Sequence, residues 1–129
     1  MLGKGKAYSG FAVEDMSNAK DFYGETLGIE IKVLDEQNGL MELQLEGGKR
    51  PTLCYQQPGT TPASYTILNF PVDDIEAAVD ALAERGVSFE RYEGTGIETD
   101  EKGIFRGGGP LIAWFKDPAG NVLSVIEQG

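Results

Sequence analysis

The sequence predicts an α+β fold built from two successive copies of one small unit, each a strand, a helix and three further strands. The first observation is a repeat, because the segment 13–21 recurs at 72–80 with five positions of similar chemistry displaced by 59 residues. The second is a linker rich in Pro, Gly and Thr at 57–64, near the midpoint of the 129 residues. The third is that segments with an apolar alternation lie on both sides of this linker. The expected parts are a single domain, 1–129, and its two modules, 7–57 and 65–128.

The first module is expected to open with a strand at 8–13 and a helix. Asp15 or Ser17 can accept hydrogen bonds from the free amides of the first helical turn, and Gly28 is a left-handed residue that can end the helix. Asn38-Gly39 is a strong hairpin signal between the next two strands. The apolar stripe of the helix comprises Met16, Ala19, Phe22 and Tyr23. The three strands that follow the helix are expected at 29–33, 40–45 and 52–56.

The second module repeats this order. A strand at 65–70 leads into a helix that Asp74 caps and Gly86 ends. A further strand is expected at 87–92. The two halves therefore share the same series of elements, which supports the duplication.

The end of the chain combines a loop and a hairpin. The segment Glu93–Gly109 holds six glycines and few apolar residues, so it is expected to be a long loop, a kind of segment that is often functional. The tetrapeptide 117–120, Asp-Pro-Ala-Gly, has the residues of a type I turn in their usual order. This turn joins expected strands at 111–115 and 121–126.

The charge of the chain restricts its partners. The formal net charge is −10, which opposes general binding to nucleic acid or to an anionic membrane and permits a cationic ligand. No apolar run approaches the roughly 20 residues of a membrane span. The basic N-terminal segment 1–6 lacks the apolar stretch of a signal peptide, so a cytoplasmic location is expected.

The chain has one cysteine and no histidine, which limits its chemistry. Cys54 cannot form an intrachain disulfide, and its apolar strand pattern predicts an unreactive core thiol. The absence of histidine excludes Ser-His-Asp and Cys-His catalytic relays and zinc sites of the His and Cys type. A metal site would need carboxylate, amide or carbonyl oxygens.

The two modules carry motifs of one known family. In the first module they are Val13-Glu14-Asp15-Met16, Phe22-Tyr23 and Leu27-Gly28. In the second they are Val72-Asp73-Asp74-Ile75 and the turn Asp117-Pro118-Ala119-Gly120-Asn121. With these motifs the repeated unit resembles the vicinal oxygen chelate superfamily, which includes glyoxalase I, bleomycin-resistance proteins and extradiol dioxygenases. The resemblance implies tandem βαβββ modules whose strands form a curved, half-open mixed sheet around a cup, the glyoxalase-like fold.

Metal-dependent members of this superfamily place one metal ligand in each of four strands. The resemblance puts these positions at Tyr8, Ile67 and Ser124, and near Leu53. None of them is a histidine or a carboxylate, and Ile67 and Leu53 have no lone pairs to offer a metal. We therefore expect no metal site and no cofactor, although a divalent metal is usual in the superfamily.

The function that the resemblance implies is the binding of a small amphipathic or aromatic molecule by a metal-free homodimer, as in bleomycin-resistance proteins. Trp114 can stack on a planar ring or can pack beneath a helix. Arg106 lies in the long loop and can reach the mouth of the cup or remain solvated. Whether the protein is an enzyme stays open, because a metal-dependent or metal-independent lyase, isomerase or dioxygenase is the alternative. The expected ligand-binding residues are Tyr8, Leu53, Tyr55, Ile67, Asn69, Trp114, Ser124 and Arg106.

Overall fold

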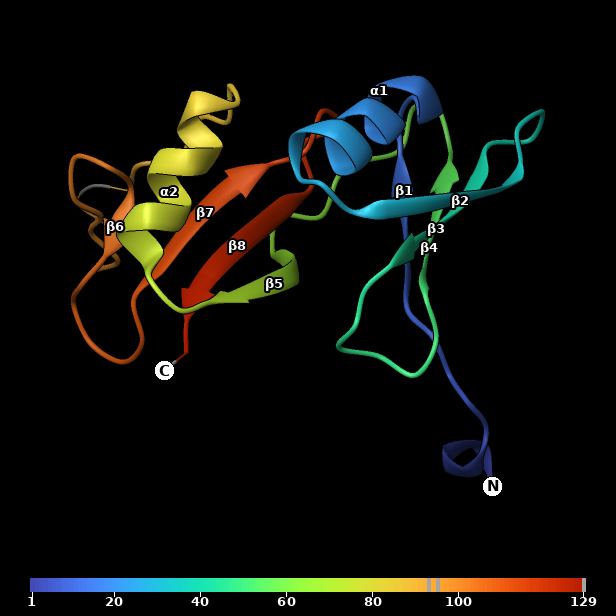
Figure 1. Ribbon diagram of the computed structural model, residues 1–129, viewed down its shortest axis with the longest axis horizontal. Helices are drawn as coiled ribbons and strands as arrows, with labels where there is room; N and C mark the ends of the chain where they lie inside the picture. The colour runs from blue at the N-terminus through green and yellow to red at the C-terminus, as the bar shows by residue number, and fades with distance from the viewer. Residues whose placement is uncertain (93, 95, 129) are drawn as a thin grey trace. The chain divides into compact units, whose positions relative to one another are not determined.

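The computed structural model describes residues 1–92, 94 and 96–128, and it divides the chain into two compact units, Met1–Pro62 and Ala63–Gly129. Each unit holds one βαβββ module (Figure 1). The elements are η1 (Leu2–Lys4), β1 (Gly10–Val13), α1 (Met16–Lys20), η2 (Asp21–Thr26), β2 (Glu30–Asp35), β3 (Leu40–Gln44), β4 (Thr52–Gln56), β5 (Thr66–Val72), α2 (Ile75–Glu84), β6 (Ile104–Phe105), β7 (Ile112–Lys116) and β8 (Val122–Glu127).

The two sheets have the same topology, which confirms the predicted duplication. The strand order is β1-β4-β3-β2 in the first sheet and β5-β8-β7-β6 in the second. The first strand of each module pairs in parallel with the last, and the other pairs are antiparallel. A parallel pair needs a crossover connection, and the helix that follows the first strand begins that connection. Neither sheet closes, so each has two edge strands, β1 and β2 in the first sheet and β5 and β6 in the second.

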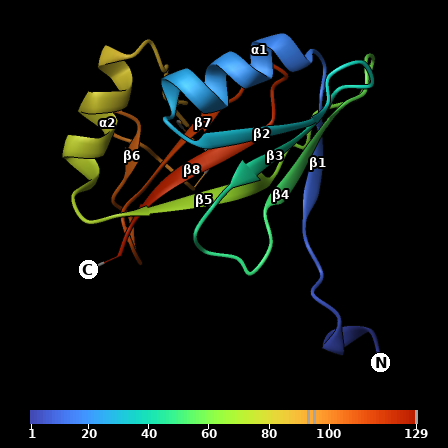
Figure 2. The same cartoon turned by 45° about the vertical axis from the view of Figure 1, so that its right-hand side comes forward.

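The helix of the first module begins at the residue that the sequence indicates. The carboxylate of Asp15 accepts hydrogen bonds from the amides of Ser17 and Asn18, so Asp15 is the N-cap. The helix continues as the wider π-helical turn η2 and ends before Gly28, whose φ of 73° is in the left-handed region. Figure 2 shows this helical segment alongside β2.

In each sheet, alternate residues form a buried face. This follows from the two-residue period of a strand. In the second module α2 packs on β8 and β7 (Figure 1). Its Ile75 and Val79 are buried. Cys54 belongs to the buried face of the first sheet, as expected for a core thiol. The buried residues of this face are Phe11, Val13, Met41, Leu43 and Cys54 in the first module and Ile104, Ala113, Phe115, Leu123 and Val125 in the second. In β8, Val122 and Ser124 are buried as well, on the opposite face.

The strand expected at 87–92 does not form, and this part of the prediction was wrong. Phe89 makes only an isolated bridge to Phe115, and the amide of Glu90 donates to the carbonyl of Trp114 at 2.8 Å. Beyond that point the edge of β7 is occupied by β6, which lies inside the segment expected to be a loop. Because each backbone edge accepts one partner, the segment 87–92 leaves the sheet where β6 joins it.

The expected loop Glu93–Gly109 is therefore only partly irregular. Glu93 and Thr95 lie outside the described residues. Thr99 and Tyr92 exchange hydrogen bonds, and Thr99 makes an isolated bridge to Phe105.

Among the described residues, no helix has the length and apolar character needed to cross a membrane.

Candidate ligand-binding faces

Three of the expected ligand-binding residues form one row across the second sheet, and we call Asn69, Ser124 and Trp114 the Trp114 row. Ser124 is the strand partner of Asn69 on one side and of Trp114 on the other. Side chains of directly paired residues lie on the same face. The neighbouring residues Phe115 and Leu123 belong to the buried face, so the row lies on the opposite face.

The polar part of the row is a hydrogen bond between two side chains. The hydroxyl of Ser124 donates to Oδ1 of Asn69 at 2.6 Å. Ser124 is buried, whereas Asn69 is exposed. In the part of the chain that the structure describes, the amide nitrogen of Asn69 has no acceptor, so it can donate to a ligand.

The apolar part of the row is an aromatic cluster around Trp114. The ring of Tyr92 lies 5.6 Å from the Trp114 ring at an interplanar angle of 66°, and the ring of Phe105 lies 6.3 Å away at 46°. Burial raises the pKa of the Tyr92 hydroxyl, and the charge of Glu90 raises it further. Trp114 itself is only partly buried. Part of an aromatic surface therefore remains available beside a hydrogen-bonding pair.

Tyr92 and Phe105 were not expected at this face. Phe105 lies in the glycine-rich segment, and only its pairing with Ile112 brings it to the face of the Trp114 row. Ile67, which was expected there, lies at a bulge of β5: Thr66 pairs with Val122 and Leu68 with Leu123, so Ile67 has no strand partner.

Arg106 is held by acidic side chains of its own module. Its Nε donates to Asp100 at 2.9 Å, and its Nη2 lies 3.3 Å from a carboxylate oxygen of Glu76 on α2. Lys102 makes a parallel contact, 3.1 Å from Asp80 on α2. These ion pairs join the segment around β6 to the helix, and Arg106 as a ligand contact stays a prediction.

The carboxylate of Asp100 accepts hydrogen bonds from several groups of the segment around β6. We predict that protonation of this carboxylate at low pH breaks these hydrogen bonds. Burial acts to raise the pKa of Asp100, but hydrogen bonds from Arg106 and from the amides of Ile104 and Lys102 together hold this pKa below its ordinary value. A lowered pKa in the folded state adds stability above the unfolded pKa of about 3.9, and this stability is lost as the pH falls through the folded pKa. The protection factor of the Ile104 amide, which is the intrinsic exchange rate at each pH divided by the observed rate, should therefore fall below about pH 4.

The matched control for this prediction is Asp100→Asn, which has no carboxyl group to titrate. We expect this variant to show faster exchange at neutral pH and no additional acid transition at Ile104. If acid affected the Ile104 amide equally in the variant and in the wild type, the assignment of this transition to Asp100 would be wrong.

In the first module, Leu53 and Tyr55 lie on the face opposite the buried one. Leu53 pairs with Gly10 and Glu42, and Tyr55 pairs with Ala12. Both side chains are partly buried. They lie on β4, the counterpart of β8, and therefore on the face that corresponds to that of Ser124 in the second module.

Tyr8 lies before β1, near the strand end where Leu53 begins its pairing. Its side chain is 52% exposed, and the guanidinium of Arg50 lies over its ring, 4.0 Å from the centroid. The backbone of the neighbouring Ser9 accepts a hydrogen bond from the amide of Leu53. Tyr8 is thus next to the residue that bonds the start of β4.

The four positions that correspond to metal ligands do not fit a metal. Tyr8 and Ser124 offer neutral hydroxyl oxygens, and the Ser124 hydroxyl is already bonded to Asn69. Throughout the described residues, no group of three or more His, Cys, Asp or Glu side chains could hold a metal ion.

Comparison with known proteins agrees with this architecture. The model of the Glyoxalase/Bleomycin resistance protein/Dioxygenase superfamily matches residues 7–125. The chain belongs to this superfamily. Its two open four-stranded sheets, one from each βαβββ module, are the glyoxalase-like fold that the sequence predicted.

Several solved structures of this superfamily's fold are similar over nearly their whole length. TnmS3, an antibiotic binding protein from Streptomyces sp. CB03234, is 25% identical, with 98% of each chain covered and a TM-score of 0.64. A superfamily member from Sphaerobacter thermophilus is 26% identical over 95% of this chain and 97% of that chain, with a TM-score of 0.66. The glyoxalase family protein from Enterococcus faecalis is 24% identical over 98% and 100%, with a TM-score of 0.66. No curated protein matches the chain.

Proposed function

We propose that this superfamily member binds a small planar aromatic molecule, preferably a cation, against the Trp114 row. The observation that carries the proposal is the combination of a partly exposed aromatic cluster with the Ser124–Asn69 hydrogen bond on one sheet face. An apolar surface with a few placed polar groups is the usual composition of a small-molecule site. The rings supply stacking, and Asn69 supplies a donor that orients the ligand.

The charge of the chain and one relative support this ligand class. A net charge of −10 attracts cations over long range, and an aromatic face attracts them at contact. The similar protein TnmS3 is described as binding an antibiotic. Binding without turnover is the simplest function for a member whose metal positions hold Tyr8, Leu53, Ile67 and Ser124.

The remaining expectations belong to the same proposal. The homodimeric state and the cytoplasmic location follow from the resemblance and from the composition. The expected ligand contacts outside the Trp114 row are Tyr8, Leu53, Tyr55, Ile67 and Arg106.

Calorimetric titration with proflavine, a planar aromatic cation, tests the proposal. We expect saturable binding that weakens as salt is added, because screening reduces the attraction of the acidic chain. Trp114→Leu keeps an apolar side chain but removes the stacking ring, so the affinity should fall about tenfold, the combined value of stacking and cation–π contact. Light scattering of the same samples should give twice the chain mass of 13.9 kDa.

The matched control is Phe89→Leu, which removes a ring from the other face of the second sheet. Phe89 contacts Phe115 at 5.5 Å between centroids, so its loss should leave the proflavine affinity unchanged. Equal affinities for the wild type and for Trp114→Leu would overturn the proposed site. An acridine carboxylate that binds as tightly as proflavine would overturn the preference for a cation.

A further inference from the structure

Glu90 continues the Trp114 row on the side away from Ser124. Phe89 makes an antiparallel bridge to Phe115, so the next residue, Glu90, lies opposite Trp114. The amide of Glu90 donates to the carbonyl of Trp114 at 2.8 Å, which holds the two residues side by side. Because successive side chains of an extended segment alternate, Glu90 is on the face of Trp114 and not on that of Phe115. A carboxylate therefore lies beside the aromatic cluster.

The carboxylate of Glu90 is paired with a lysine of the same face. Nζ of Lys116 lies 3.1 Å from Oε1 of Glu90. Lys116 follows Trp114 by two residues on β7, so both side chains are on one face of the sheet. The side chain of Glu90 is 30% exposed and that of Lys116 is 51% exposed. An ion pair that is open to solvent contributes little free energy, so another cation can replace Lys116 at small cost.

The charges of Glu90 and Lys116 both act on the aromatic cluster. Burial is the main cause of the raised pKa of the Tyr92 hydroxyl; the charge of Glu90 raises this pKa further, and the charge of Lys116 lowers it. The ring of Tyr92 lies 5.6 Å from the ring of Trp114. A cation stacked on Trp114 is therefore close enough to be attracted by Glu90 and repelled by Lys116.

We propose that Glu90 is the counter-ion that makes the site at the Trp114 row select cations, and that a bound aromatic cation replaces Lys116 at this carboxylate. The ring of the ligand stacks on Trp114, and an N–H group of the ligand donates to Glu90. The ammonium of Lys116 moves into water. The inference rests on the proposed function, because it concerns the same ligand. It adds the residue that sets the charge preference and the residue that competes with the ligand.

Calorimetric titration of variants with proflavine tests this inference. Glu90→Gln keeps the size of the side chain and removes its charge, so the affinity should fall about fivefold, the value of one solvent-exposed ion pair. Lys116→Met removes the competing ammonium, so the affinity should rise about threefold. A rise in affinity cannot result from a loss of folded structure. In the double variant the rise should vanish, because no carboxylate remains to be released.

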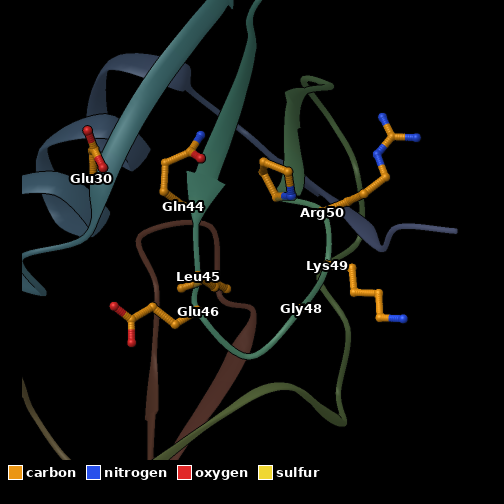
Figure 3. Close-up of a pocket in the computed structure, with 8 residues that line it drawn as sticks. Glu30, Gln44, Leu45, Glu46, Gly48, Lys49 and Arg50 are labelled. Atoms are coloured by element: carbon orange, nitrogen blue, oxygen red, sulfur yellow. The ribbon is translucent and has the colours of Figure 1, made fainter. Parts of the chain in front are cut away.

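The matched controls make the same charge changes on β2 of the first module. Glu30→Gln removes a carboxylate that lines a pocket of that module (Figure 3), and Lys32→Met removes an exposed ammonium. Neither residue belongs to the second sheet, and salt screens distant charges, so both variants should bind proflavine as the wild type does.

Acridine is the matched probe, because it has the fused rings of proflavine and is uncharged in mildly alkaline buffer. It can stack on Trp114 but offers no cation to Glu90. Its affinity should therefore be the same for the wild type, Glu90→Gln and Lys116→Met.

The outcomes separate this inference from the function on which it rests. The absence of saturable proflavine binding would overturn both. Proflavine binding that weakens in Trp114→Leu but is unchanged in Glu90→Gln would overturn the inference alone. An equal rise for Lys116→Met with and without Glu90 would also overturn it, because Lys116 would then only repel the ligand and not occupy its counter-ion.

Discussion

Replacement of Phe115 by alanine is expected to lower the free energy of unfolding by about 3–5 kcal/mol, the usual cost of deleting a buried aromatic ring. Phe115 is 1% exposed, packs against the ring of Phe89 and is paired with the buried Leu123. The chain has a single tryptophan, and Trp114 is adjacent to the substituted residue. Its fluorescence during urea denaturation therefore reports the unfolding of the second module.

The control for this prediction is Phe105→Ala, on the face of the Trp114 row. Phe105 is only partly buried, so the loss of its ring should cost clearly less than the loss of Phe115. The contrast tests the functional proposal as well, because a ligand-binding face must be less completely packed than the helix-covered face. Equal losses in the two variants would mean that both faces are closed, which contradicts a binding surface at Trp114.

Replacement of Asp117 by alanine is expected to lower the free energy of unfolding by about 3–5 kcal/mol, because it disrupts the turn that joins β7 and β8. Asp117 is 4% exposed, and its carboxylate accepts hydrogen bonds from the amides of Ala119 and Asn121 and from the side chain of Asn121. Asn121 is also buried, and its own oxygen accepts from the amide of Ala63. Alanine would leave these donors unpaired in a buried site, and such donors carry the full cost of desolvation. Trp114 fluorescence during urea denaturation again measures the loss of unfolding free energy.

Asp35→Ala is the matched control, because Asp35 makes a similar turn in an exposed place. Its carboxylate accepts from the amide and the side chain of Asn38, and these hydrogen bonds lower the pKa of Asp35. Water can replace them in the variant, so the loss of stability should be much smaller than for Asp117→Ala. Similar losses in the two variants would show that burial is not what makes the Asp117 turn important.

The candidate faces could be predicted in part, because the strand period specifies which residues share a face. By this period Asn69 and Ser124 were both expected on the ligand-binding face, and the structure shows them as direct partners joined by a hydrogen bond. The same argument could not anticipate the bulge at Ile67, because a bulge breaks the two-residue period. It also could not show that Arg106 is paired with Asp100 and Glu76, since an ion pair across elements depends on where each element lies.

The sequence alone determined the duplicated module, the helix caps and the alternation of the strands. These features are local: Asp15 and Asp74 cap the helices that follow them, and the left-handed Gly28 and Gly86 end those helices, within a few residues of chain. The sequence alone also shows that the chain contains no histidine.

Only the tertiary structure decided which strand occupies the free edge of β7 and which polar group is left unpaired. The segment 87–92 has a good strand pattern, yet β6 takes the edge of β7, because competition for one backbone edge is settled between segments distant in sequence. Gln44 looks like any polar strand residue in the sequence, and only the structure shows that its side-chain nitrogen is buried without a partner among the described residues. Long-range pairing and burial are properties of the whole module, and they cannot be read from a local pattern.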